Sequence, residues 1–123
     1  MLAQSINRTD ELKKVMSSCY GTENYYINNY LHFKYTDGVR TFCEKAAGYW
    51  ILNIIEGVLI QFKQMREDLI RIVLTVREDN TATITFTDSE DDFYKQKIPF
   101  TDCPVGEWGF YFEHDVFFWE GEY

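Results

Sequence analysis

The chain changes its hydrophobic period part-way along, and this change constrains the fold more than any other feature. No proline occurs between residues 39 and 63, and apolar residues recur there every three or four positions, which is typical of a buried helix. From residue 69 onward the pattern alternates, as in the Thr-Ala-Thr-Ile-Thr-Phe-Thr run of residues 81–87. Alternation is typical of strands with one buried face. The sequence therefore predicts an α+β fold.

Local patterns give the expected elements. We expect a short N-terminal helix over residues 9–19 and one long central helix from residue 39 or 40 to about 63, with a turn at residues 36–38 before it. The expected strands cover residues 30–35, 69–76, 81–87, 93–98, 108–113 and 116–119. Short connections favour an antiparallel meander, with both helices packed on one face of the sheet.

Two glycines fall inside the expected central helix. Gly48 and Gly57 each cost about 1 kcal/mol relative to alanine in a helix interior. We expect close packing against a neighbouring element to explain both.

The length of 123 residues predicts a single domain over residues 1–123. Three widely spaced cysteines, Cys19, Cys43 and Cys103, form no Cys-x-x-Cys pair, so we expect reduced, buried thiols. The N-terminus lacks the continuous apolar core of a secretion signal. The most apolar stretch, residues 49–62, is shorter than the ~20 residues that span a bilayer. We therefore expect a cytosolic protein without a membrane anchor.

Acidic residues concentrate in the second half of the chain. The net charge is −8, and residues 1–62 hold six acidic and six basic residues, whereas residues 63–123 hold fourteen and six. Aromatic residues alternate with the acids in the C-terminal part, in larger numbers than one sheet face can bury. A net negative chain is a poor binder of phosphate backbones, so we expect no direct nucleic-acid binding and no membrane binding.

Two interpretations of this region stay open. The acids can form a solvated face that confers solubility, or a surface that attracts a basic patch on a partner protein. In the second interpretation tryptophans anchor the contact. The candidate partner-binding residues are Asp88, Glu90, Asp91, Asp92, Glu107, Trp108, Glu113, Asp115, Trp119, Glu120 and Glu122.

No catalytic or metal-binding motif stands out. Asp88, Glu90 and Asp92 resemble the start of a calcium loop, but Phe93 replaces the required glycine and Pro99 the bidentate glutamate. The only histidines, His32 and His114, would have to meet in the fold to form a metal or acid–base centre. We expect no enzyme activity, no cofactor and no metal.

Four separated blocks carry a family resemblance. They are Tyr35–Arg40 (YTDGVR), Glu44–Leu52 (EKAAGYWIL), Gln96–Pro104 (QKIPFTDCP) and the terminal Glu122-Tyr123. Together they resemble an uncharacterised domain-of-unknown-function family of small bacterial, plasmid and phage proteins, over roughly residues 10 to 123. The resemblance brings no established activity. It implies a setting on mobile elements in a bacterial cytosol, where small acidic inhibitors of host defence, including anti-CRISPR proteins, are common.

These observations lead to two functional hypotheses. The first is a non-enzymatic acidic protein that docks on a basic surface of a host defence nuclease or effector complex, as an anti-CRISPR-like inhibitor or nucleic-acid mimic. The second is a small-ligand protein that binds or sequesters nucleotides in an aromatic-lined pocket, within one chain or in a homodimer. A nucleotide site would need cations near the aromatic rings, and the candidates are Lys34, Arg40, Lys45 and Lys97. A hydrolase would require carboxylates or His114 to converge in a cleft.

Overall fold

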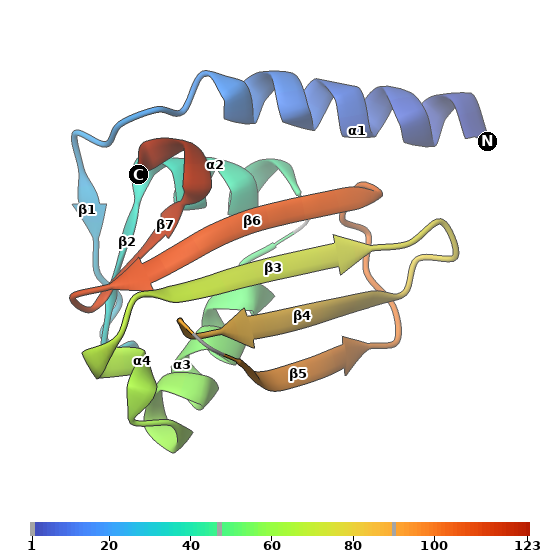
Figure 1. The fold of residues 1–123 in the computed structure, drawn as a ribbon. Helices are drawn as coiled ribbons and strands as arrows, with labels where there is room; N and C mark the ends of the chain where they lie inside the picture. The colour runs from blue at the N-terminus through green and yellow to red at the C-terminus, as the bar shows by residue number, and fades with distance from the viewer. Residues whose placement is uncertain (1, 47, 90) are drawn as a thin grey trace.

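A computed structural model describes residues 2–46, 48–89 and 91–123, so Met1, Ala47 and Glu90 lie outside the described residues. Figure 1 shows one sheet with α2 and α3 behind it and α1 along its upper side. The predicted α+β class is confirmed. In chain order the elements are α1 (Leu2–Ser17), β1 (Tyr25–Tyr26), β2 (Lys34–Thr36), α2 (Asp37–Lys45), α3 (Trp50–Gln61), α4 (Gln64–Glu67), β3 (Ile70–Val76), β4 (Ala82–Thr87), β5 (Asp92–Ile98), β6 (Gly106–Glu113), β7 (Val116–Trp119) and the 3-10 turn η1 (Glu120–Glu122).

The seven strands form a mixed sheet in the order β1-β2-β7-β6-β3-β4-β5. The predicted hairpins β3–β4 and β6–β7 are present. The simple meander is wrong in two places, because β6 pairs with β3 instead of β5 and β2 pairs in parallel with β7. The reason for the first lies in β6 itself, where Trp108, Phe110 and Phe112 are all buried. A central position gives these large rings neighbours on both sides, and their burial is the main driving force.

The predicted long central helix is also wrong, because it is divided into α2 and α3. Gly48 has a φ of +125°, a conformation that L-residues other than glycine rarely adopt. Its N–H donates to the carbonyl of Cys43 at 2.9 Å, which satisfies a carbonyl at the end of α2. Gly48 therefore ends a helix through its backbone conformation, and a Cβ at this position would in addition lie only 3.3 Å from Cδ1 of Trp50. Gly57 has no atom within 4 Å of the position that a Cβ would take, so close packing does not explain that glycine.

Two N-terminal elements differ from their predicted bounds. The first helix starts earlier than residue 9, although its buried residues, Leu12 and Met16, belong to the predicted helical pattern. The predicted strand at residues 30–35 is shortened, because the chain turns after Asn28. The Asn28 side chain accepts from the N–H of Tyr30 at 2.9 Å, and its carbonyl accepts from the N–H of Leu31 at 3.0 Å. Asparagine favours such turns because its side chain bonds to nearby backbone.

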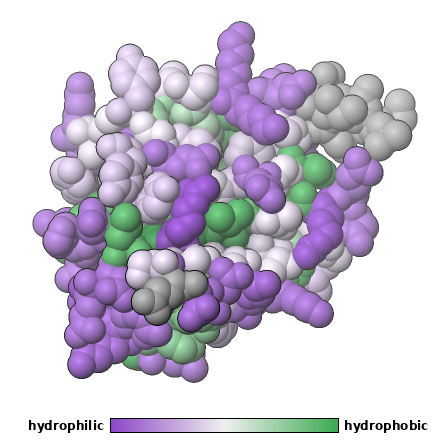
Figure 2. All heavy atoms as spheres, viewed as in Figure 1, coloured by the Kyte–Doolittle hydropathy of each residue, from purple (hydrophilic) through white to green (hydrophobic). Residues whose placement is uncertain are grey.

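The two faces of the sheet carry different side chains. The helix-covered face is apolar and joins the buried side of the helices in one core. The opposite face, which we call the open face, carries the alternate residues of each strand, and Figure 2 shows it as a mixture of hydrophilic and pale side chains with separate apolar areas. Among the described residues, no helix combines the length and apolar character that a bilayer crossing requires. The open-face residues of the five longer strands include Arg71, Val73, Thr75, Thr83, Thr85, Lys95, Lys97, Glu107, Tyr111, Glu113 and Phe118.

Candidate functional site

The acidic residues of the C-terminal part do not form one continuous surface. Asp115 pairs with Arg66 at 2.9 Å, and Glu120 pairs with Arg71 at 2.8 Å. Asp92 accepts from the hydroxyl of Thr87 at 2.6 Å and lies 3.8 Å from the ammonium of Lys95. Partners within the chain thus offset part of the expected negative field.

The remaining candidate acids lie in separate places. Asp88 and Asp91 belong to the β4–β5 turn, where the Asp88 carboxylate accepts from the N–H of Asp91 at 2.9 Å. Glu90 belongs to the same predicted cluster but lies outside the described residues. Glu107 and Glu113 stand near opposite ends of β6, about 20 Å apart at ~3.4 Å per residue. The expectation of a single anionic sheet surface is therefore not met.

The two tryptophans proposed as anchors belong to the core. Trp108 is 1% exposed and Trp119 is 8% exposed. The indole N–H of Trp108 donates to the carbonyl of Pro104 at 3.0 Å, as a buried indole requires. Their role as surface anchors is wrong, because both lie on the helix-covered face of their strands. The expectation that some C-terminal aromatics are exposed is confirmed by Phe100 and Tyr123.

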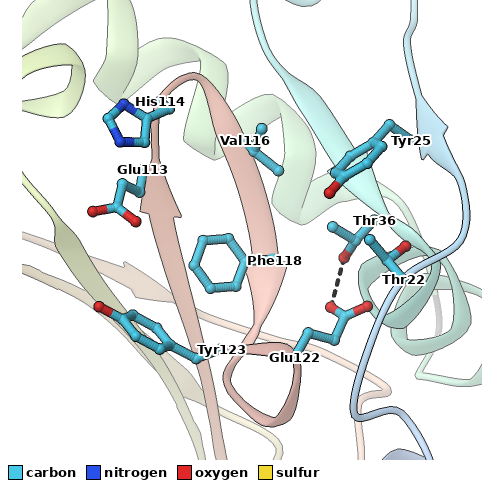
Figure 3. Close-up of a pocket in the computed structure, with 9 residues that line it drawn as sticks. All are labelled: Thr22, Tyr25, Thr36, Glu113, His114, Val116, Phe118, Glu122 and Tyr123. Atoms are coloured by element: carbon cyan, nitrogen blue, oxygen red, sulfur yellow. Dashed lines mark hydrogen bonds between the residues drawn. The ribbon is translucent and has the colours of Figure 1, made fainter.

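A cavity of about 320 Å³ opens on the open face, between β1, the β6–β7 hairpin and the end of the chain. In Figure 3, Phe118 lies in the middle, Glu113 and His114 lie to one side, and Tyr25, Thr36 and Thr22 lie to the other. Segments far apart in sequence build it together. Its lining residues are Thr22, Tyr25, Thr36, Glu113, His114, Val116, Phe118, Glu122 and Tyr123.

One wall of the cavity is built on the start of α2. Thr36 is the N-cap residue of α2, and its hydroxyl accepts from the N–H of Val39 at 3.4 Å. The Glu122 carboxylate accepts from the hydroxyl of Thr36 at 2.6 Å, the N–H of Gly38 at 3.0 Å and the N–H of Trp119 at 2.9 Å. A carboxylate at this helix end satisfies otherwise unpaired amides and the positive end of the dipole. Glu122 thus fastens the end of the chain to α2.

Asp37, next to this wall, holds the preceding loop in place. The Tyr26 hydroxyl donates to its carboxylate at 2.6 Å, and the N–H groups of Glu23 and Asn24 donate at 3.0 and 3.1 Å. The Tyr26 hydrogen bond and the two backbone hydrogen bonds lower the pKa of Asp37 to about 2, against the effect of burial. The carboxylate is therefore ionised at any physiological pH.

The opposite wall is the β6–β7 turn. His114 and Asp115 both have positive φ, 53° and 60°, as a two-residue hairpin of the I′ type requires. Asn-Gly is the usual pair in such turns, and His and Asp adopt the left-handed region less readily than glycine does. Glu113 precedes this turn, and its carboxylate forms no hydrogen bond or ion pair with any described residue. This wall therefore carries a carboxylate that no described residue pairs with.

Aromatic rings complete the cavity. Tyr25 is 59% exposed and Tyr123 is 69% exposed. The Tyr123 ring lies 5.8 Å from that of Phe118 and 4.9 Å from that of Tyr111, measured between centroids. Among the described lining residues there is no lysine and no arginine. The cavity thus combines exposed rings with carboxylates.

The two histidines meet at a second hollow, of about 480 Å³, beside β2. His32 and His114 both line it, and His32 Nδ1 lies 2.6 Å from the Glu56 carboxylate. Over the described part of the chain, no group of three or more His, Cys, Asp or Glu side chains is arranged to hold a metal ion. Burial raises the pKa of Cys43 and of Cys103 to about 12, so both thiols stay protonated and poorly nucleophilic.

A family model matches residues 10–123, a span that includes every lining residue of the cavity. The chain belongs to a family of unknown function (DUF6876). No curated protein and no solved structure gives a match to the chain. Two of the sequence blocks that indicated a family resemblance, Tyr35–Arg40 and Glu122-Tyr123, come together at the hydrogen bonds that Glu122 makes with Thr36 and Gly38.

Sequence reasoning did not predict this cavity, although two of the acids it proposed for partner binding line it. Glu113 and Glu122 were among the predicted partner-binding residues, and the structure places them on opposite walls. Thr22, Tyr25 and Thr36 were not predicted, because their contribution depends on the pairing of β1 with β2 and of β2 with β7. The tyrosine-rich, weakly charged segment around Tyr25 was the available indication, since such residues gather at binding surfaces.

Proposed function

We propose that this protein is a non-enzymatic binding module that docks on a basic surface of a partner protein through the cavity on its open face. The observation that carries the proposal is the cavity's lining, which joins Tyr25, Phe118 and Tyr123 with Glu113 and includes no described lysine or arginine. Carboxylates beside aromatic rings attract cationic groups by both charge and the ring quadrupole. The net charge of −8 adds long-range attraction to a basic partner.

Local structure supports a binding role for this edge. His114 and Asp115 hold one wall in left-handed backbone conformations, which are uncommon for residues other than glycine and cluster at functional sites. Tyr25 and Tyr123 present apolar rings to solvent, whereas hydrophobic burial would favour covering them. A partner that covers these rings would recover that free energy.

We propose a nucleic-acid-handling defence complex of the host as the partner. Such a complex suits the acidic cavity, because it carries basic surfaces for phosphate backbones.

The nucleotide hypothesis is less well supported, because none of its required cations lines the cavity. Lys34 lines the neighbouring hollow, and Arg40 lies over the Tyr26 ring. Lys97 lies opposite Thr83 in the β4–β5 strand pair, at the other end of the sheet.

Fluorescence anisotropy with a labelled peptide tests the proposal. The probe is a 20-residue Gly/Ser peptide carrying six evenly spaced basic residues, three arginines and three lysines, and its control replaces all six with glutamine. We expect binding of the basic peptide alone, weakened at least fivefold between 50 and 300 mM salt.

Two matched variants locate the interaction. Glu113→Gln should weaken binding about fivefold, whereas Glu78→Gln, which removes the same charge from the β3–β4 turn at the other end of the sheet, should change it less than twofold. Equal losses in both variants would mean that net charge alone attracts the peptide. No binding of the basic peptide at 50 mM salt would overturn the proposal.

A further inference from the structure

We infer that the group this cavity recognises is an arginine side chain of the partner protein. The inference rests on the proposed function and adds the chemical identity of the recognised group. It depends on three observations: the contacts that two arginines of this chain make, the residues that line the cavity, and the chemical differences between guanidinium and ammonium.

Two arginines of the chain are held by the same pair of groups. The Arg71 guanidinium carbon lies 4.9 Å from the centroid of the Tyr111 ring, and its Nη2 donates to Glu120 at 2.8 Å. The guanidinium carbon of Arg40 lies 4.7 Å from the centroid of the Tyr26 ring. In each case the guanidinium covers a tyrosine ring and pairs with a glutamate carboxylate.

The second cluster repeats the first at a different place in the fold. The Nε of Arg40 donates to Glu44 at 3.3 Å, and the Tyr49 hydroxyl donates to the same carboxylate at 3.4 Å. The lysine ion pairs among the described residues, Lys63 with Glu67 and Lys95 with Asp92, have no accompanying ring contact. Rings and carboxylates together thus accompany two arginines in this structure, whereas Arg66 pairs with the Asp115 carboxylate at 2.9 Å without a ring contact among the described residues.

The cavity presents this combination without a lysine or arginine among its described lining residues. Tyr25 and Tyr123 supply exposed rings, Phe118 supplies a third, and Glu113 supplies a carboxylate that no described residue pairs with. Its volume of about 320 Å³ lies at the lower end of the range for ligand pockets. This size suits the end of one long side chain better than a nucleotide.

Guanidinium fits this lining better than ammonium does. A guanidinium is planar and weakly hydrated, so it can stack on a ring with one face while its N–H groups donate sideways to a carboxylate. An ammonium is compact and strongly hydrated, and it loses more hydration on entering a site walled by rings. The aromatic walls should therefore discriminate, whereas the carboxylate should attract either cation.

The test compares peptides that differ only in the cation. Three 20-residue Gly/Ser peptides carry six arginines, six lysines or six citrullines, and citrulline keeps the shape of arginine without its charge. We expect the arginine peptide to bind at least fivefold more tightly than the lysine peptide in fluorescence anisotropy at 100 mM salt. The citrulline peptide should show no measurable binding.

Ring variants show whether the preference arises in the cavity. Tyr25→Leu and Tyr123→Leu keep apolar bulk but lack a π face, and each should bring the ratio of arginine to lysine affinity below twofold. Tyr30→Leu is the matched control, because Tyr30 is 85% exposed and does not line this cavity. It should retain the full ratio. Thermal unfolding of each variant checks that the fold is kept.

The outcomes distinguish failure of the arginine inference from failure of the proposed function. Equal affinity for the arginine and lysine peptides, with both weakened in Glu113→Gln, would overturn the arginine inference and leave the proposed function standing. A preference for arginine that survives both ring variants would also overturn the inference. Failure of both basic peptides to bind would overturn the proposed function together with it.

Discussion

The two faces of the sheet are made from alternate residues of the same strands, yet they differ in almost every physical respect. Phe110 and Tyr111 are neighbours in β6, but Phe110 lies in the helix-covered core beside Phe42 and Tyr111 lies on the open face beneath Arg71. The covered face is continuous, apolar and buried, whereas the open face carries rings, threonines and charges of both signs. The comparison teaches that this sheet gains its stability on one face, which leaves the other able to hold a binding site.

The largest expected effect separates the two faces at adjacent residues. Phe110→Ala should lower the free energy of unfolding by about 3–5 kcal/mol, because it leaves a cavity among buried rings. Tyr111→Ala should cost only about 1 kcal/mol, from the lost ring and cation contacts. Urea unfolding followed by circular dichroism measures both. Similar losses for the two variants would contradict the assignment of stability to one face.

The second effect tests an exception on the open face, since Glu122 lines the cavity and also fastens the chain end to α2. Glu122→Ala should lower the free energy of unfolding by about 2–3 kcal/mol, because it removes a charged acceptor from two amides and a hydroxyl. Glu107→Ala, an exposed acid on the same face, should stay within about 0.5 kcal/mol. If both variants unfold at the same urea concentration, the role assigned to Glu122 is incorrect.

A smaller effect depends on pH. The folded pKa of Asp37, about 2, is below the value of ~3.9 expected in the unfolded chain. Its contribution is therefore fully present above about pH 4 and is lost as the pH falls through 2. Asp37→Asn should cost on the order of 1 kcal/mol at pH 7 and should flatten the decline of stability between pH 4 and 2. Acid titration of the unfolding midpoint compares the two proteins, and an unchanged slope would exclude this carboxyl group as a cause.

The smallest effect is a gain on the solvent side of the helix layer. Gly57 is exposed within α3 and has room for a methyl group. Gly57→Ala should raise the free energy of unfolding by about 0.5–1 kcal/mol, because alanine restricts the unfolded chain and favours helix. Chemical denaturation detects this gain. A lower free energy of unfolding would indicate that the added methyl group clashes with a neighbouring group, contrary to the open space found at Gly57.

Much of the second half of the fold could be predicted from the sequence, because alternation reports one buried face directly. Residues 81–87 and the turn at His114-Asp115 are examples, and both hairpins form as predicted. The helical half was harder. The period of three to four continues on both sides of Gly48, so the pattern alone does not reveal that its positive φ ends α2.

The site could be predicted only in part, because its lining depends on pairings between distant segments. Thr36-Asp37-Gly38 resembles a turn in sequence, although Thr36 is in fact a helix N-cap and Asp37 a loop anchor. Acidic composition had indicated Glu113 and Glu122 as partner-binding candidates, and the structure places both in the cavity lining. It could not show that Glu120 and Asp115 are paired with arginines, since ion pairs between strands and turns depend on tertiary structure.

The parallel pairing of β2 with β7 has a kinetic consequence. Lys34 and Tyr35 lie beside Val116 and Phe117, so about two thirds of the chain must close into a loop before these strands can join. Such closure is entropically costly and slow, and the edge of the sheet is expected to form last and to open first. Hydrogen exchange at the β2 amides should therefore be faster than at those of β3. A partner seated in the cavity would bridge the early and late segments of the chain and slow that opening.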